Sequence, residues 1–91
     1  MSEASARVTI VNMRGLHARA AAKICETASA FQSRIEVSKD GTAVGARSLM
    51  ALLMLGAGKG SKVTLRAEGP DAEEAVKAVR ELIEAGFHEE E

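Results

Sequence analysis

The residue types most suited to chemistry are a histidine and an arginine two positions apart, His17 and Arg19, in the segment GLHAR at residues 15–19. A strand-like pattern ends just before this segment and a helical pattern follows it, so we expect the imidazole at the start of a helix. Backbone N–H groups in a first helical turn lack partners within the helix, and with the helix dipole they favour an anion. A phosphoryl group on His17 would therefore be held by this turn, with Arg19 as a further donor and Gly15 leaving room for a close approach.

Residue types alone leave a second interpretation open. A single histidine at a helix boundary is, in most sequences, only a polar residue that ends up near solvent. Two other motifs offer weaker chemistry. Residues 56–61, GAGKGS, resemble part of a nucleotide-binding loop but follow a helical pattern and precede a strand, which is the wrong order. His88 stands among carboxylates without a second ligand at a usual spacing, so we expect no metal site and no cofactor.

Composition excludes several functional classes. The chain has 91 residues, enough for one domain with one core. Phe31 and Phe87 are its only aromatic residues and the net charge is −1, so neither base stacking nor a global field favours nucleic acid. The charge is nevertheless uneven: residues 1–66 carry +6 and residues 67–91 carry −7. The first part is therefore basic enough to meet an anion or an acidic partner.

The apolar spacing predicts the elements that must position the histidine. Alternation predicts strands at residues 6–11, 34–38, 42–44 and 62–67, and helical spacing predicts helices at 18–31, 49–55 and 72–85. Asp40-Gly41 is typical of a tight hairpin turn, Ser48 of a helix N-cap, and Asp71 with Glu74 of a capping box. We predict one domain over residues 1–91, frayed at 1–5 and 87–91. Its fold class would be α+β, an open-faced two-layer sandwich of order β-α-β-β-α-β-α, with three helices on one face of a mostly antiparallel sheet.

Two segments resemble one known family. GLHARAAAK at residues 15–23 closely matches the active-site motif of the HPr family, the histidine-containing phosphocarriers of the bacterial phosphotransferase system. ARSLMALLMLGAGKGSKV at residues 46–63 resembles the second signature of that family. The resemblance extends over about the whole chain. Details at residues 12–15 and 86–91 look more like the nitrogen-related NPr branch than the sugar-transport branch.

The resemblance implies a role for each matching residue. His17 would be phosphorylated on Nδ1 by the phosphohistidine of enzyme I and would pass the group to a histidine of an enzyme IIA. Arg19 matches the phosphate-binding arginine, and Gly15 and Ala18 complete the motif around the phosphoryl group. One departure concerns Ala20, which stands where the family usually has proline. Alanine is the best helix former, so the change affects the rigidity of the site more than its chemistry.

The second signature implies regulation and docking. Ser48 matches the serine that HPr kinase/phosphorylase modifies in bacteria that have this enzyme, and a phosphate there would add about −1.5 to −2 charges beside an apolar surface. Residues 49–55 hold more apolar side chains than one helix face can bury. Leu52 and Leu55 are expected in the core. The residues that match the family's docking surface are Leu49, Met50, Leu53 and, at its rim, Arg47.

The sequence therefore predicts a phosphocarrier rather than an enzyme with small-molecule turnover. Its partners would be enzyme I, enzyme IIA proteins and, in bacteria that have it, HPr kinase/phosphorylase, with no nucleic acid and no membrane, and the protein would act as a monomer. The lone Cys25 fits a reducing compartment, and MSEASARVTI has no apolar core of a secretory signal, so we expect a cytoplasmic location. The alternative is a regulatory interaction module that is never phosphorylated and acts only through residues 49–53.

Overall fold

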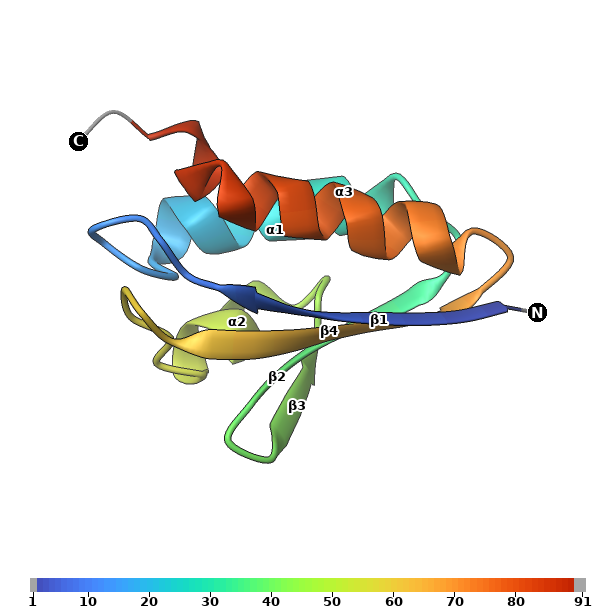
Figure 1. Cartoon of the computed structure of the whole chain (residues 1–91), viewed down its shortest axis with the longest axis horizontal. Helices are drawn as coiled ribbons and strands as arrows, with labels where there is room; N and C mark the ends of the chain where they lie inside the picture. Colours follow the sequence, from blue (N-terminus) through green and yellow to red (C-terminus); the bar gives the residue numbers. More distant parts are fainter. Residues whose placement is uncertain (1, 90–91) are drawn as a thin grey trace.

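The computed structural model describes residues 2–89 and has the predicted order of elements. Four strands form one antiparallel sheet in the order β1-β4-β2-β3. The elements are β1 (Ser2–Thr9), α1 (Ala18–Ser29), β2 (Arg34–Lys39), β3 (Thr42–Gly45), α2 (Leu49–Met54), β4 (Lys62–Gly69), α3 (Ala72–Glu84) and a 3-10 turn, η1 (Gly86–His88). Figure 1 shows α1 and α3 side by side along one face of the sheet, as the predicted two-layer architecture requires.

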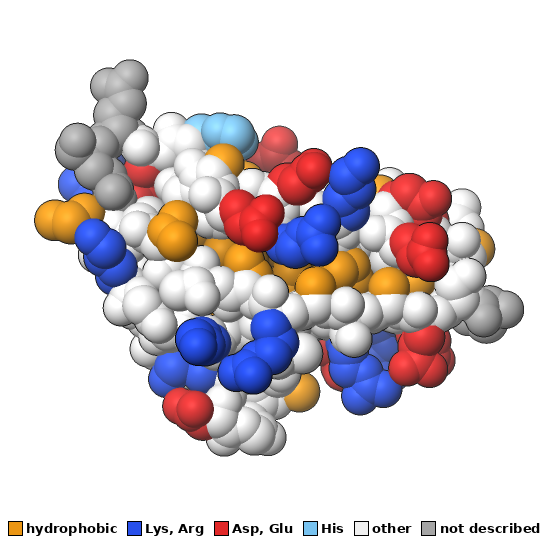
Figure 2. Space-filling view, in the orientation of Figure 1, with side chains coloured by type: hydrophobic (Ala, Val, Ile, Leu, Met, Phe, Trp, Pro, Cys, Tyr) orange, Lys and Arg blue, Asp and Glu red, His pale blue; other side chains and the backbone are white. Residues whose placement is uncertain are grey.

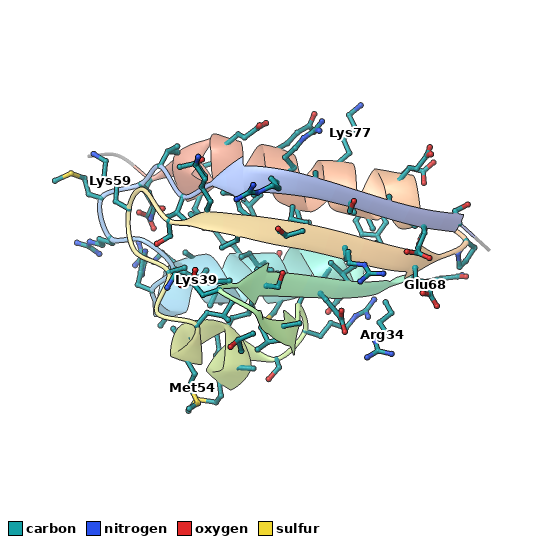
Figure 3. The ribbon with its side chains drawn as sticks, turned by 60° about the horizontal axis from the view of Figure 1, so that its bottom comes forward. Arg34, Lys39, Met54, Lys59, Glu68 and Lys77 are labelled. Carbon is teal, nitrogen blue, oxygen red and sulfur yellow. The ribbon has the colours of Figure 1, made fainter. Side chains whose placement is uncertain are left out.

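The core lies between the sheet and the helices because each strand alternates apolar and polar side chains. On β4, Val63, Leu65 and Ala67 are buried while the intervening side chains face away from the helices. Leu65 pairs with Ala6 of β1 on one side and with Val37 of β2 on the other, so it sits at the centre of the apolar face. The opposite face carries polar and charged side chains, including Arg34 and Glu68, and stays open (Figure 3).

The turn between β2 and β3 forms as predicted. Asp40 and Gly41 have φ values of 51° and 83°, the left-handed conformations of a two-residue type I′ hairpin loop. Such a loop twists in the same sense as the strands it joins, which holds β3 at the edge of the sheet. The short helix α2 then packs against α1 and β3.

Fraying is expected at residues 1–5 and 87–91, but residues 2–5 and 87–89 are placed in regular contacts. Strand β1 begins at Ser2, which pairs with Gly69, and it ends at Thr9 instead of continuing to residue 11. Small polar residues at its start hide this strand from an apolar pattern, but β4 supplies backbone partners for each of them. At the other end, Phe87 is fully buried. Residues 1, 90 and 91 lie outside the described residues.

The capping box expected at the start of α3 does not form. Asp71 occupies the N-cap position, but its side chain makes no capping hydrogen bond. Its carboxylate instead accepts hydrogen bonds from the backbone N–H groups of Gln32 at 2.9 Å and Ser33 at 2.8 Å, and from the Ser33 hydroxyl at 2.5 Å. Ser33 in turn accepts from the Asp71 N–H at 3.1 Å. This long-range cluster joins the loop before β2 to the start of α3, and a local sequence pattern cannot show it.

The hydrogen bond from the Ser33 hydroxyl, followed by that from the Gln32 N–H, lowers the pKa of Asp71 below its usual range. Because the pKa is lower in the folded state, the ionised carboxylate stabilises the fold at pH values above its unfolded-state pKa of about 3.9. That contribution disappears as the pH falls through the lowered pKa of the folded state.

We therefore expect Asp71→Asn to lower the urea midpoint at pH 7, and we expect its difference from the parent protein to shrink as the pH falls below about 4. Urea titrations followed by circular dichroism from pH 7 to pH 2.5 test this. Asp40→Asn is the matched control, since it removes one exposed carboxylate, which pairs with Lys39 in the hairpin. A difference between Asp71→Asn and the parent that stays constant over this range would contradict the account.

Candidate functional site

His17 lies at the N-cap of α1, as the sequence predicts. Its backbone is extended, with φ −85° and ψ −178°, and its carbonyl accepts the first hydrogen bond of the helix, from Ala21 N–H at 2.8 Å. The ring Nδ1 accepts a hydrogen bond from the Arg19 N–H at 3.3 Å. The side chain keeps 23% of its surface exposed. The imidazole therefore caps the helix as a Ser or Asp side chain does elsewhere, with one nitrogen aimed at the positive end of the helix.

The first turn of α1 offers several donors to an anion beside Nδ1. Because Ala21 donates the first intrahelical bond, the N–H groups of Ala18, Arg19 and Ala20 precede the helical hydrogen-bond ladder. The Arg19 side chain is exposed, and within residues 2–89 its guanidinium has no hydrogen-bond or ion-pair partner. It is thus available to a phosphoryl group that replaces the capping bond. Ala20, at the position of the family's proline, is fully buried and continues the helix without a break.

Gly15 is expected to leave room for an incoming group, but in the structure it allows the close contact of two loops. It is buried, and a Cβ atom on it would lie 2.7 Å from both the Ala57 carbonyl oxygen and the Gly58 Cα. Its φ of +66° is a left-handed conformation that suits glycine. Next to it, Leu16 N–H donates to the Ala57 carbonyl at 2.8 Å. Gly15 therefore lets two loops touch, and this contact fixes where the chain enters α1.

Sequence analysis missed two residues of the site, Asn12 and Glu89. Asn12 is 1% exposed, and its Nδ2 donates to the Gly15 carbonyl at 2.8 Å and to Glu89 Oε1 at 3.0 Å. The other carboxylate oxygen of Glu89 contacts Nε2 of the His17 ring. A nearby bond from Lys23 Nζ to the Phe87 carbonyl also ties the tail to α1. Because Glu89 stands 72 positions after His17, no spacing rule connects them.

The environment of Glu89 favours its charged form. The hydrogen bond with His17 is the main cause that lowers the pKa of this carboxyl; the bond from Asn12 and the positive charge of Lys23 add to it, while desolvation opposes them. The carboxylate therefore remains ionised at neutral pH. The histidine is held between a backbone donor at Nδ1 and an acceptor at Nε2.

Helix α2 presents an apolar surface. Ser48 caps it by accepting from the Ala51 N–H at 3.4 Å, and Leu52 and Leu55 are buried as predicted. Leu49, Met50 and Met54 are exposed. Leu53, expected in the docking surface, is partly buried against the core, whereas Met54 projects from the helix with 82% exposure (Figure 3). We refer to Leu49, Met50 and Met54 as the α2 apolar patch.

Arg47, also expected at the rim of the docking surface, has an internal role. Its guanidinium donates to the carbonyls of Ala28 at 2.9 Å, Phe31 at 2.5 Å and Ser33 at 3.2 Å. These carbonyls lie at and beyond the end of α1, where backbone acceptors lack helical donors. Arg47 therefore joins the start of α2 to the end of α1, and its donors on this side are not free for a partner.

The apolar patch and the histidine lie on neighbouring parts of the molecule. Helix α2 ends three residues before Ala57, and the Ala57 carbonyl binds the N–H of Leu16, the residue preceding the histidine. Met13, which is 65% exposed, and Lys59 extend from the two loops on this side. Basic side chains predominate below the strands and acidic ones over α3 in the view of Figure 2, so the sequence asymmetry of charge persists in space.

Two further properties concern the part of the chain that the structure describes. It contains no group of three or more His, Cys, Asp or Glu side chains placed to hold a metal ion. Its longest helix, α3, has 13 residues, and no helix within 2–89 combines the length and hydrophobicity needed to cross a bilayer.

Comparison with known proteins defines the family. The family described as "PTS HPr component phosphorylation site" matches residues 4–85. The chain is 48% identical over 81 residues to phosphocarrier protein HPr of Cupriavidus necator, covering 89% of this chain and 91% of that protein. It is 40% identical over 89 residues to phosphocarrier protein NPr of Shewanella violacea, covering 98% of each. The crystal structure of HPr-C-His from Thermoanaerobacter tengcongensis superposes with a TM-score of 0.89, at 48% identity and full coverage of both chains.

The open-faced sandwich of one four-stranded sheet and three helices is the fold of the solved HPr structures. The chain belongs to the HPr family of phosphocarrier proteins of the phosphotransferase system, which includes NPr.

The contact of Gly15 with residues 57–58 gives a prediction for stability. Gly15→Ala and Gly41→Ala both place alanine at positive φ, which costs about 1–2 kcal/mol. Only Gly15→Ala adds a backbone clash, and overpacking costs about 1–3 kcal/mol more. Since 1 kcal/mol corresponds to about 4–8 °C in a domain of this size, the Tm of Gly15→Ala should fall well below that of Gly41→Ala in differential scanning calorimetry. Equal Tm values for the two variants would contradict this role.

Proposed function

We propose that the protein carries a phosphoryl group on Nδ1 of His17, accepting it from the phosphohistidine of enzyme I and passing it to an enzyme IIA. The observation that carries this proposal is the bond from the Arg19 N–H to Nδ1 of a partly exposed ring. It places Nδ1 where a phosphoryl oxygen would meet the donors of a helix N-terminus. The family of the chain supports the same exchange.

The chemistry needs only groups already at the site. The lone pair of Nδ1 attacks the phosphorus of the donor, a new N–P bond forms, and the donor's N–P bond breaks with its electron pair returning to the donor ring. The phosphoryl oxygens then take over the Arg19 N–H and meet the guanidinium of the same residue. Transfer to the acceptor reverses these steps. Partial exposure of the ring lets successive partners reach the same nitrogen.

The test incubates the protein with enzyme I and phosphoenolpyruvate and measures phosphate bound to the protein. We expect one acid-labile phosphate per chain in the parent protein and none in His17→Ala. The matched control is His88→Ala, which removes the other histidine of the chain and should be labelled like the parent.

Unaltered labelling of His17→Ala would refute the site. The competing interaction module predicts something different again, namely that His17→Ala keeps every effect on partners while substitutions of the α2 apolar patch abolish them. The two hypotheses therefore separate in one set of variants.

The acceptor is an enzyme IIA in either sugar uptake or nitrogen and metabolic regulation. Similar proteins carry both names, HPr and NPr. Residues 12–15 and the acidic ending resemble the nitrogen-related branch, which favours regulation as the output. Phosphoryl exchange with enzyme I and enzyme IIA pairs of each branch, compared by kcat/KM, assigns the pathway. The lone Cys25 fits a reducing compartment, which favours the cytoplasm as the location of the proposed exchange.

A second phosphorylation, on Ser48, is part of the proposal. The hydroxyl is exposed at the N-cap of α2, beside Leu49 and Met50 of the apolar patch. A phosphate there suits the helix start, so the fold should survive. It also adds charge at the edge of the surface on which enzyme I would dock, and partner binding should weaken.

Ser48→Asp imitates this charge. Aspartate is a good N-cap, so we expect Tm within a few degrees of the parent, while the rate of phosphorylation by enzyme I falls on the order of tenfold because charge is placed beside the patch. Ser5→Asp adds the same charge on the open face of β1 and should leave the rate unchanged. A Ser48→Asp rate equal to that of Ser5→Asp would contradict docking at this surface.

A further inference from the structure

The contact between Glu89 and the His17 ring is fixed by burial and by further hydrogen bonds. Glu89 keeps only 11% of its side-chain surface exposed, with one oxygen on His17 Nε2 and the other accepting from Asn12 Nδ2 at 3.0 Å. Asn12 is itself buried and fixed by its bond to the Gly15 carbonyl. The buried Phe87, whose carbonyl accepts from Lys23 Nζ, anchors the tail two residues earlier. Three segments, the loop at residues 12–15, helix α1 and the tail at residues 87–89, thus hold the carboxylate beside the ring.

The two hydrogen bonds of the ring select one tautomer. An ionised carboxylate only accepts hydrogen bonds, so Nε2 must carry the proton in this contact. The Arg19 N–H only donates, so Nδ1 must present its lone pair. Both partners demand the same neutral form, with hydrogen on Nε2 and the nucleophilic electron pair on Nδ1.

We propose that Glu89 is a positioning residue for phosphoryl transfer, whose carboxylate keeps the proton on Nε2 of His17 in both the free and the phosphorylated protein. This inference rests on the proposed function of His17. It adds a group that touches the ring on the side away from the reacting nitrogen and controls the charge of the ring.

The balance of the step shows why a carboxylate is useful there. A neutral ring with hydrogen on Nε2 gives the Nδ1 lone pair to phosphorus and keeps its proton, so the phosphorylated ring carries a positive charge. Glu89 offsets that charge without any proton transfer. When the N–P bond breaks, its electron pair returns to Nδ1 and the ring leaves as the same neutral tautomer. A ring that lost the Nε2 proton would have to leave as an anion and would be a poorer leaving group.

Most of the other charged groups on the surrounding segments are basic, although α1 also carries Glu26 and α3 ends at Glu84. Lys23 and Arg19 lie on α1, Arg14 on the loop that precedes it, and Lys59 on the facing loop, while His88 precedes Glu89 in the tail. Lys23 contributes to lowering the pKa of the Glu89 carboxyl and thus to keeping it ionised. None of these cations can replace Glu89 in holding a proton on Nε2.

The test compares Glu89→Gln with the parent protein and with Glu81→Gln, which removes one exposed carboxylate from α3. In the free protein, long-range ¹H–¹⁵N spectra at a pH where the ring is neutral report the tautomer. We expect hydrogen mainly on Nε2 in the parent and in Glu81→Gln, and a larger share on Nδ1 in Glu89→Gln. This readout needs no enzyme I.

In the phosphorylated protein, the rate of phosphate release is followed against pH. Because the Glu89 carboxylate holds the Nε2 proton, Glu89→Gln should move the pH profile of phosphate release to lower pH. At pH 8 the release should slow by about two- to fivefold. Glu89→Asp, which keeps the charge on a shorter side chain, should restore part of the rate. Tm values equal to the parent's exclude a folding defect.

The inference would be overturned if Glu89→Gln had the same tautomer and the same pH profile of phosphate release as the parent protein. Faster phosphorylation by enzyme I with an unchanged profile would also overturn it, since the tail would then act as a cover over the ring. If the proposed function itself is wrong, the result is different: enzyme I does not label the parent protein at His17.

Discussion

The hydrogen bond from the Arg19 N–H to Nδ1 of His17 is the interaction on which the rest of the site depends. It makes the histidine the cap of α1, so the nitrogen faces the positive end of the helix and the ring remains partly exposed. A cap of this kind is also easily exchanged, because a phosphoryl oxygen offers the same N–H a better acceptor. Under the proposed function, the same donor would therefore stabilise the site with and without a phosphoryl group.

The position of that cap is set by loops that are distant in sequence. The contact of Gly15 with residues 57–58 and the bond from Leu16 to Ala57 fix the entry into α1. Asn12 ties the same turn to Glu89. The sheet beneath provides a rigid base, since β1 and β4 run side by side, one of the two loops follows β1 and the other precedes β4. A ring held from two sides in this way has little freedom to lose when a partner docks.

Several features of the fold and the site could be predicted from the sequence because they depend on neighbouring residues. His17 and Ser48 precede helical patterns, and Asp40-Gly41 needs a left-handed turn, so each position follows from its immediate neighbours. The failures concern side chains whose partners are far along the chain. Asp71 binds residues 32–33 instead of its own helix, and Arg47 donates to carbonyls at and beyond the end of α1. Glu89 reaches His17 only because the chain folds back after α3, which no spacing rule reveals.

The most direct measurement of the central claim is a long-range ¹H–¹⁵N correlation spectrum of the protein after phosphorylation by enzyme I. The account predicts that phosphorus is bonded to Nδ1 of His17 and that the Arg19 amide shows a large change in chemical shift as it turns to the phosphoryl oxygens. Phosphorus on Nε2, or an Arg19 amide that does not respond, would contradict it.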